Sequence, residues 1–295
     1  MNIRFRNERE VTDGPDTAAS LAAAARCYCA AVDPAALAGL EHANMLHAFG
    51  STAQHVPGAL VAHDGGVLLV ASGLPIRVFN AVMIERDTAT PEAIADAVST
   101  LRERAVPFVV HLRRRTDDRF VPVAKRLGLE LPADHAPMPG MAMPLPAEQA
   151  RVTPALDIRR VIDSVGQEDH ILTSAVGFGA PPDLIRPWIG ADMWERPGVS
   201  MYVGYVEDNA VTTGIGIVSG RTIGIYNVAT IPSARKRGFG AAITHRIAAD
   251  GEAAGCDVAA LQASDMGRPV YESLGYRTVV EYDGWIDPVE RRSPS

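Results

Sequence analysis

The segment ARKRGFGAA (234–242) combines positive charge with backbone freedom. Three basic residues, 235–237, come before Gly238 and Gly240, and the segment follows the β-rich run 221–231. A strand, a glycine turn and a helix in this order direct unpaired backbone N–H groups and the positive end of the helix dipole at an anion. Glycine also lets the backbone approach a phosphate closely. The segment therefore predicts an anion site, with a charged surface loop as the simpler alternative.

An internal repeat shows which elements hold this segment. Shifted by 147 residues, VASGLPIRVFNAVMI (70–84) matches IVSGRTIGIYNVATI (217–231) at five positions. At the same offset, DRFVPVAKRLG (118–128) matches DMGRPVYESLG (265–275) at five positions. One offset shared by two separate segments predicts a tandem duplication. The proline-containing stretch 137–154 is expected to hold the last strand of the first unit and then the linker, with the boundary near residue 150.

The second unit has the pattern of a mixed α/β sheet covered by helices. A helix is expected after Gly240, with Ile243 and Ile247 on one face, and a second helix that stops at Gly275. β-rich runs bounded by turn residues predict the strands, at 156–163, 199–206, 210–219, 221–231, 256–264 and 276–287.

The first unit provides an internal comparison for the glycine turn. At the offset of 147, Thr90 stands opposite Arg237, Pro91 opposite Gly238 and Ala93 opposite Gly240. TPEAIADAVSTL has the signature of a capped helix, with Thr90 as N-cap and Pro91 in the first turn. We therefore expect the first unit to close its helix terminus and the second to leave it open for a ligand.

Together, VATIPSARKRGFGAA (228–242) and PVYESLGY (269–276) resemble the acetyl-CoA-binding elements of the GNAT superfamily of N-acetyltransferases. The resemblance is full over about 155–287 and degenerate over about 1–148. It implies two tandem GNAT-like domains, each a mixed, mostly antiparallel sheet flanked by helices. The expected divisions are 1–148 without the acetyl-CoA loop, 152–288 as the catalytic domain, and a flexible tail at 289–295.

The resemblance also implies roles for particular residues. The backbone of Val228, Ala229 and Thr230 would bind the pantetheine arm, and the N–H groups of about 237–241 would bind the pyrophosphate. Tyr271 would protonate the departing thiolate; the alternative is a packed helix tyrosine. The full set implied to bind acetyl-CoA is Val228, Ala229, Thr230, Arg235, Lys236, Arg237, Gly238, Phe239, Gly240, Ala241 and Ser264.

Three positions depart from that pattern. Ser264 stands where the family often has Asn, and Gly267 where it usually has Ala. Ala124 stands opposite Tyr271 in the first unit, which indicates that the first unit cannot catalyse the transfer. A tyrosine introduced at Ala124 is therefore expected to be silent.

The sequence offers several candidates for the residues that face the acceptor and does not single one out. GQEDHILTSAVGFG (166–179) offers Glu168, Asp169 and His170, for which a solvated helix face is the alternative. Tyr226 and Asn227 lie beside the pantetheine strand, and because strand side chains alternate, one of the two should face the acceptor. Phe79 and Asn80 hold the equivalent places in the first unit, so Asn227 is also open to a structural role. The tryptophans 188 and 194 are candidates for a pocket wall or for packing.

The composition and charge of the chain argue against some classes of function. The chain has 295 residues and a net charge of −7, which disfavours nucleic-acid binding. The three cysteines, Cys27, Cys29 and Cys256, have no zinc spacing and are expected to be reduced thiols in a cytoplasmic, metal-free protein without a membrane segment, monomeric or homodimeric.

The expected function is transfer of an acetyl group from acetyl-CoA, or another acyl-CoA, to a primary amine of a small molecule or peptide. The alternatives are a non-catalytic acyl-CoA-binding regulator and another thioester reaction on the same fold.

Overall fold

The structure is a computed structural model that describes residues 33–146, 156–190 and 192–288. From Pro34 onward the described chain forms one compact unit. Its helices are α2 (Pro34–Ala53), α3 (Pro91–Glu103), α4 (Val121–Arg126), α5 (Ser164–Phe178), α6 (Pro182–Ile189), α7 (Phe239–Ala253) and α8 (Arg268–Ser273). Its strands are β1 (Leu60–Asp64), β2 (Val67–Ala71), β3 (Asn80–Ile84), β4 (Val109–Arg113), β5 (Met138–Pro144), β6 (Asp157–Arg160), β7 (Val199–Val206), β8 (Asn209–Ser219), β9 (Thr222–Thr230), β10 (Val258–Gln262) and β11 (Arg277–Ile286).

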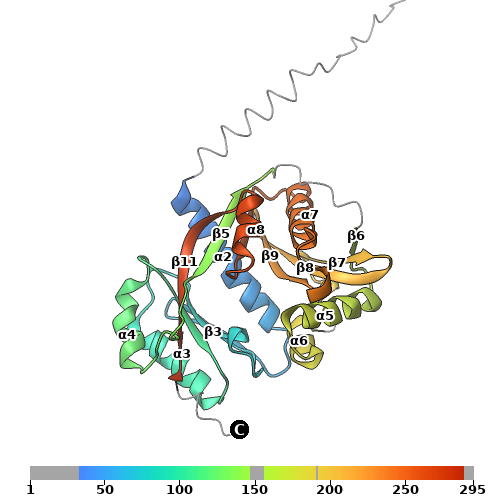
Figure 1. The fold of residues 1–295 in the computed structure, drawn as a ribbon. Helices are drawn as coiled ribbons and strands as arrows, with labels where there is room; N and C mark the ends of the chain where they lie inside the picture. Colours follow the sequence, from blue (N-terminus) through green and yellow to red (C-terminus); the bar gives the residue numbers. More distant parts are fainter. Residues whose placement is uncertain (1–32, 147–155, 191, 289–295) are drawn as a thin grey trace, which may run out of the picture. The chain divides into compact units, whose positions relative to one another are not determined.

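All of these strands form one mixed sheet in the order β1-β2-β3-β4-β11-β5-β10-β9-β8-β7-β6 (Figure 1). The pairs β3–β4 and β9–β10 are parallel, and the other neighbours are antiparallel. A mixed sheet flanked by helices was the fold class predicted from the sequence, and it is confirmed.

The last strands of the two sequence halves exchange places in the middle of the sheet. β11 pairs with β4 and β5, and β5 pairs with β10 and β11. On either side of this central pair, β1–β4 and β7–β10 follow in mirror order. A duplicated unit with exchanged last strands would give this order. The expected boundary near residue 150, the tail at 289–295, Cys27 and Cys29 lie outside the described residues.

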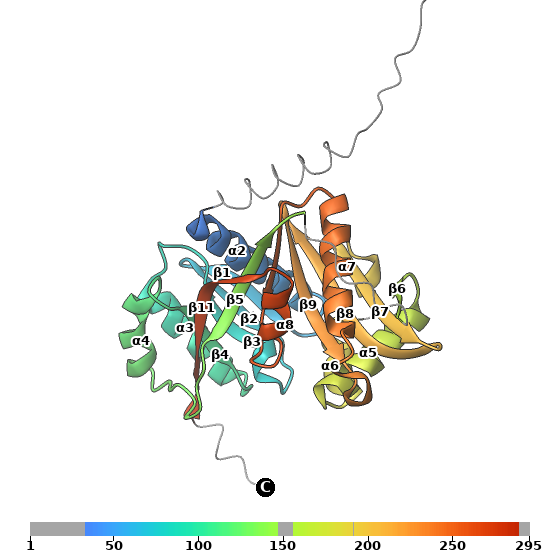
Figure 2. The same ribbon diagram turned by 45° about the horizontal axis from the view of Figure 1, so that its top comes forward.

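Helices cover both faces of the sheet (Figure 2). Because successive strand side chains point to opposite faces, the buried side chains of one strand contribute to the core on both sides. On β2, Leu68 and Val70 pack with Met45 of α2, while Leu69 packs with Ile94 of α3. In the second half, α5 packs on one face of β8, with Ile171 beside Ile215 and Ile217. On the opposite face, α7 packs against β9, where Ile243 and Ile247 contact Ile223 and Ile225.

The second-half elements match their predicted places closely. β7 spans the expected 199–206, and Ile243 and Ile247 share the buried face of α7. Gly275 follows α8 with φ of 95°, the left-handed conformation of a helix stop. Cys256 is buried and free. Among the described helices, none has the length and apolar character needed to cross a bilayer.

Candidate active site

The N-terminus of α7 is open. Gly238, with φ of 80°, is its N-cap and has no side chain to accept a hydrogen bond. Among the described contacts, no backbone N–H from Lys236 to Ala241 donates a hydrogen bond, and the first to do so is Ala242, to Gly238 O at 3.0 Å. The turn thus presents a run of unpaired donors at the positive end of a helix dipole.

The corresponding helix in the first half is closed, as predicted. Thr90 is the N-cap of α3, and its Oγ1 accepts a hydrogen bond from Ala93 N at 3.2 Å. Pro91 occupies the first turn and removes another N–H, and Glu92 lies beside the helix dipole.

The basic residues of the turn have different surroundings. Arg235 donates from Nη2 to Gly177 O at 2.7 Å and from Nε to Thr230 O at 3.2 Å, so it ties the turn to α5 and β9. The guanidinium of Arg237 lies 4.7 Å from the ring centre of Phe239, which is buried beneath it. Lys236 and Arg237 are exposed. Arg235 therefore shapes the turn, and the other two supply exposed charge.

Strand β9 separates from β10 next to this turn (Figure 2). The two strands pair only where Thr222–Gly224 faces Val258–Ala260. Further along, β10 continues against β5, while Ala229 and Thr230 pair with β8 alone. The described sheet thus leaves one backbone edge of Val228, Ala229 and Thr230 free, and such an edge can add an extended ligand as a strand.

Tyr271 lies on α8, on the α7 face of the sheet. Its ring and the side chain of Val228 pack against the same buried cluster. Burial raises the pKa of Tyr271 to about 12, so the phenol is protonated at neutral pH. A Cβ at Gly267 would lie 2.9 Å from Cε2 of Tyr271, so glycine at this position leaves room for the ring. Ser264 accepts a hydrogen bond from Gly267 N at 3.2 Å and caps the turn that carries the tyrosine.

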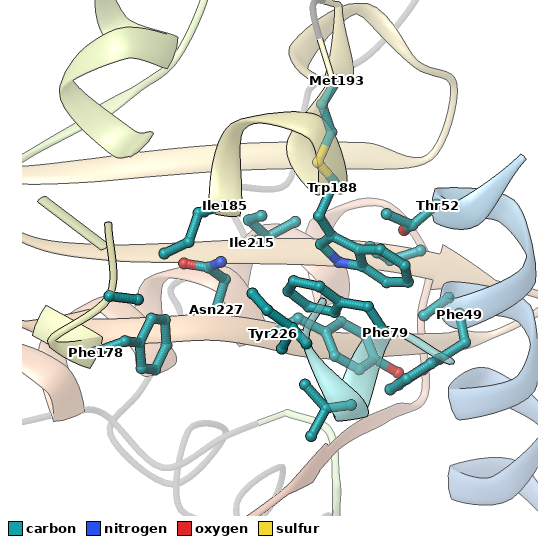
Figure 3. A pocket seen from close by; sticks show the side chains of 15 residues that line it. Phe49, Thr52, Phe79, Phe178, Ile185, Trp188, Met193, Ile215, Tyr226 and Asn227 are labelled. Atoms are coloured by element: carbon teal, nitrogen blue, oxygen red, sulfur yellow. The ribbon is translucent and has the colours of Figure 1, made fainter. Parts of the chain in front are cut away.

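A cavity of about 380 Å³ lies on the α2 and α5 face of the sheet, and both Tyr226 and Asn227 line it (Figure 3). Alternation predicted that only one of them would face this side. The difference arises at a bulge, because Asn227 has φ of 50° and β9 gains one residue relative to β8 there.

Asn227 lies next to a buried histidine. Its Oδ1 is buried without a hydrogen-bond partner, as is Nε2 of His170. Nδ1 of His170 is 3.1 Å from Tyr202 O and donates to it. Burial lowers the pKa of His170 to about 4, and the neighbouring Asn227 opposes this shift only in part. His170 is therefore a neutral imidazole behind the cavity wall.

The remaining acceptor candidates lie elsewhere. Glu168 forms an ion pair with Arg186, and Asp169 accepts a hydrogen bond from Tyr205 at 2.7 Å. Neither residue lines the cavity, and neither does Trp194, whereas Trp188 does. Among the described residues, no three His, Cys, Asp or Glu side chains cluster as a metal site.

The sequence did not predict that several other residues would line the cavity. Phe49 and Phe79 come from the first half and Phe178 from the second, and they meet only because α2, α5 and α6 converge over β8 and β9. The structure adds a packing cost to the tyrosine that was expected to be silent at Ala124. Ala124 is 1% exposed in the core beneath α3 and α4, so a tyrosine there would overpack it.

Several solved structures with a similar fold are described as N-acetyltransferases. A GCN5-related N-acetyltransferase from Kribbella flavida superposes with a TM-score of 0.62 at 15% identity, covering 82% of this chain and 94% of that one. A GCN5-related N-acetyltransferase from Sphaerobacter thermophilus has a TM-score of 0.56 at 15% identity, covering 75% and 80%. A putative GNAT-family acetyltransferase from Novosphingobium aromaticivorans has a TM-score of 0.54 at 15% identity, covering 84% and 97%. No protein-family model and no curated protein matches the sequence. The chain thus has the GNAT fold that the glycine turn and the tyrosine helix predicted.

Proposed function

We propose that this chain is an acyl-CoA-dependent N-acyltransferase whose donor site lies at β9, α7 and α8 of the GNAT fold. The open N-terminus of α7 beside the free edge of β9 is the observation that carries the proposal. The equivalent helix, α3, is closed by Thr90, so an open terminus is not a general property of this chain.

The donor site divides into two parts. Unpaired N–H groups of residues 237–241 would bind the pyrophosphate of acetyl-CoA, with Lys236 and Arg237 adding positive charge. The free backbone edge of Val228, Ala229 and Thr230 would bind the pantetheine arm as an added strand. Ser264 would lie at the rim of this site through the turn it caps.

Tyr271 is proposed as the general acid. Its hydroxyl is protonated at neutral pH because burial raises its pKa, and it packs on the same cluster as Val228 of the donor strand. A thiolate leaves more readily when a positioned group protonates it as the bond breaks. The phenol would then recover a proton from solvent.

The acceptor would approach from the cavity side of β9, where Tyr226 and Asn227 lie. The amine nitrogen forms a bond to the acyl carbon and the carbon–sulfur bond breaks. The proton that the amine loses balances the proton that the sulfur gains. We propose a primary amine of a small molecule or peptide as the acceptor and no metal in the reaction. The first half would serve as a structural partner that provides one side of the cavity.

The test is turnover by the full-length protein with acetyl-CoA and a panel of amines, followed by the release of free thiol. The expected result is amine-dependent release together with the N-acetylated product. Binding of acetyl-CoA without turnover of any amine would contradict catalysis and favour a non-catalytic acyl-CoA-binding protein. Thiol release without an N-acetyl product would favour another thioester reaction.

A further inference from the structure

The cavity on the α2 and α5 face has the size and lining of a small-molecule site (Figure 3). Its volume of about 380 Å³ falls in the range of about 300–1,000 Å³ usual for such sites. Of its fifteen lining residues, only Thr52, Trp188, Tyr226 and Asn227 have polar side-chain atoms. The cavity therefore suits a ligand group that is mostly apolar.

Aromatic rings form one wall of the cavity. Trp188 stacks on Phe79 with ring centres 4.3 Å apart and planes at 7°, and it meets the edge of Phe49 at 6.0 Å. At the opening, Val78 and Phe178 are 53% and 55% exposed, unusually high for large apolar residues beside a cavity. Flat aromatic walls favour an aromatic ligand, which can stack or meet them edge-on.

One hydrogen-bond acceptor in the cavity has no partner. Asn227 lines the cavity at the bulge of β9, and its Oδ1 is buried beside the neutral imidazole of His170 and accepts no hydrogen bond. The Tyr226 hydroxyl, in contrast, already donates to Asn44 Oδ1 at 2.6 Å. A buried unpaired amide oxygen is costly unless a ligand donates to it.

No side chain that lines the cavity is charged at neutral pH. The nearby carboxylates are engaged elsewhere: Glu168 with Arg186, Asp169 with Tyr205, and the buried Glu41 with Tyr282 and Gln262. An alkylammonium ion would lose its hydration here without an anionic partner, which strongly disfavours its entry. A group that enters uncharged avoids this cost.

From these contacts we infer that the acceptor is an aromatic amine of low basicity, with its ring against Trp188 and Phe79 and an N–H donated to Asn227 Oδ1. The inference rests on the proposed N-acyltransferase function and specifies its substrate class. Such an amine is neutral at physiological pH, so it needs no base to free its lone pair before attack. The nitrogen bonds to the acyl carbon, the thioester carbon–sulfur bond breaks, and one proton passes from nitrogen to sulfur, by way of Tyr271 and solvent.

Two isomeric amines separate basicity from size. 4-Methylaniline and benzylamine have the same atoms, but at pH 7.5 the first is neutral and the second is protonated. With full-length protein saturated with acetyl-CoA, kcat/KM for 4-methylaniline should exceed that for benzylamine by about tenfold or more, because benzylamine must either enter as an unpaired cation or first lose its proton. Calorimetry in the presence of CoA should give the same order of affinity.

Substitutions at Asn227 test the contact itself. Asn227→Gly tolerates the positive φ and removes the amide, so kcat/KM for 4-methylaniline should fall about tenfold while acetyl-CoA affinity is kept. Asn227→Asp places a carboxylate in the cavity and should shift the preference towards benzylamine. The charge-matched control is Gln54→Glu, on the exposed end of α2 just after its last turn, which should leave the preference unchanged.

The outcomes distinguish the inference from the function on which it rests. If benzylamine or another basic amine is the better substrate of the unaltered protein, the inference is overturned and the N-acyltransferase function stands. Competition between octanoyl-CoA and 4-methylaniline with no acetylation of the amine would also overturn it, because the cavity would then hold an acyl chain. Failure of acetyl-CoA to bind at all would contradict the proposed function instead.

Discussion

Helices α3 and α7 follow β3 and β9, which hold mirror-related places in the sheet, and the 147-residue repeat aligns the segments that begin the two helices, yet their N-termini differ. Thr90 and Pro91 satisfy or remove donors at the start of α3, whereas Gly238 leaves the donors of α7 unpaired. The same contrast holds for two asparagines at this offset. The side chain of Asn80 makes five hydrogen bonds, while Oδ1 of Asn227 is buried beside the imidazole of His170 and accepts no hydrogen bond. In these two comparisons the first half pairs its polar groups internally, and the second half leaves the polar groups that we propose for ligand binding without such partners.

The largest expected effect follows from separating the halves. Within the described strands, β11 pairs with β4 and β5 of the first half, and β5 pairs with β10 and β11 of the second. Each half alone would leave its last strand without a neighbour. We expect 1–148 and 152–295 to be insoluble or unfolded by circular dichroism when expressed singly, and to form a folded complex when co-expressed.

A monomeric 152–295 that unfolds cooperatively with the stability of the full chain would contradict this account of the sheet. The buried contact between Trp285 of β11 and the first-half core predicts the same dependence, because the fragment would expose that indole.

Removing the Tyr271 hydroxyl should have the next largest effect. Tyr271→Phe keeps the ring that packs on the α7 cluster, so acetyl-CoA affinity and folding should be kept while kcat falls by about 10²–10⁴. The matched control is Tyr276→Phe, because that hydroxyl is buried without a partner and its loss should keep kcat unchanged. Near-full turnover of Tyr271→Phe, with chemistry rate-limiting, would show that Tyr271 is a packing residue.

The asparagine comparison can be sharpened by measuring stability. Asn80→Ala removes a side chain that accepts from Ser72 and donates to Leu74, Ile76 and Pro107, so the free energy of unfolding should fall by about 3 kcal/mol or more. Asn227→Gly should change it by less than about 1 kcal/mol, because no described partner is lost from Oδ1 and the positive φ suits glycine. Equal losses in urea unfolding would contradict the assignment of Asn227 to ligand binding.

A smaller effect is expected from the buried carboxyl that joins the halves. Glu41 of α2 accepts hydrogen bonds from Tyr282 and Gln262, both at 2.6 Å, and burial raises its pKa from 4.5 to about 7. The folded state therefore keeps a proton that the unfolded chain releases between pH 4.5 and 7. Protonated Glu41 therefore favours the folded state. This contribution to the free energy of unfolding is fully present below pH 4.5 and is lost as pH rises through 7.

Glu41→Gln stays neutral at every pH, so it isolates this titration. Relative to the variant, the unaltered protein should lose up to about 3 kcal/mol of stability between pH 4.5 and 7.5, measured by urea unfolding. Glu252→Gln, on the exposed side of α7, should show no such pH-dependent difference. A pH-independent difference for Glu41→Gln would mean that Glu41 is ionised throughout.

The sequence predicted those features of the site that depend on a few adjacent residues. The Thr90 cap, the Gly238 turn and the Gly275 stop each depend on a few adjacent residues, and all three are found. The strand exchange was not predictable, because β5 and β11 carry ordinary strand patterns that do not specify a neighbour.

The cavity was not predictable for a related reason. Phe79 and Trp188 stack although they are far apart in the chain, and neither has a local pattern that points to the other. The bulge at Asn227 also breaks the alternation of strand side chains. Because Asn227 has a positive φ, its side chain lies on the same face of β9 as that of Tyr226. Tertiary packing, which no single segment encodes, decided both features.

The most direct test of the contrast between α3 and α7 is calorimetry with acetyl-CoA on three proteins. The unaltered chain should bind one equivalent. Gly238→Asp should abolish binding, because it places a carboxylate and a Cβ at a donor turn with φ of 80°. Pro91→Asp places the same side chain in the first turn of α3, at the residue that the offset of 147 aligns with Gly238, and this variant should bind as the unaltered chain does. Two equivalent sites, or full affinity in Gly238→Asp, would contradict the account.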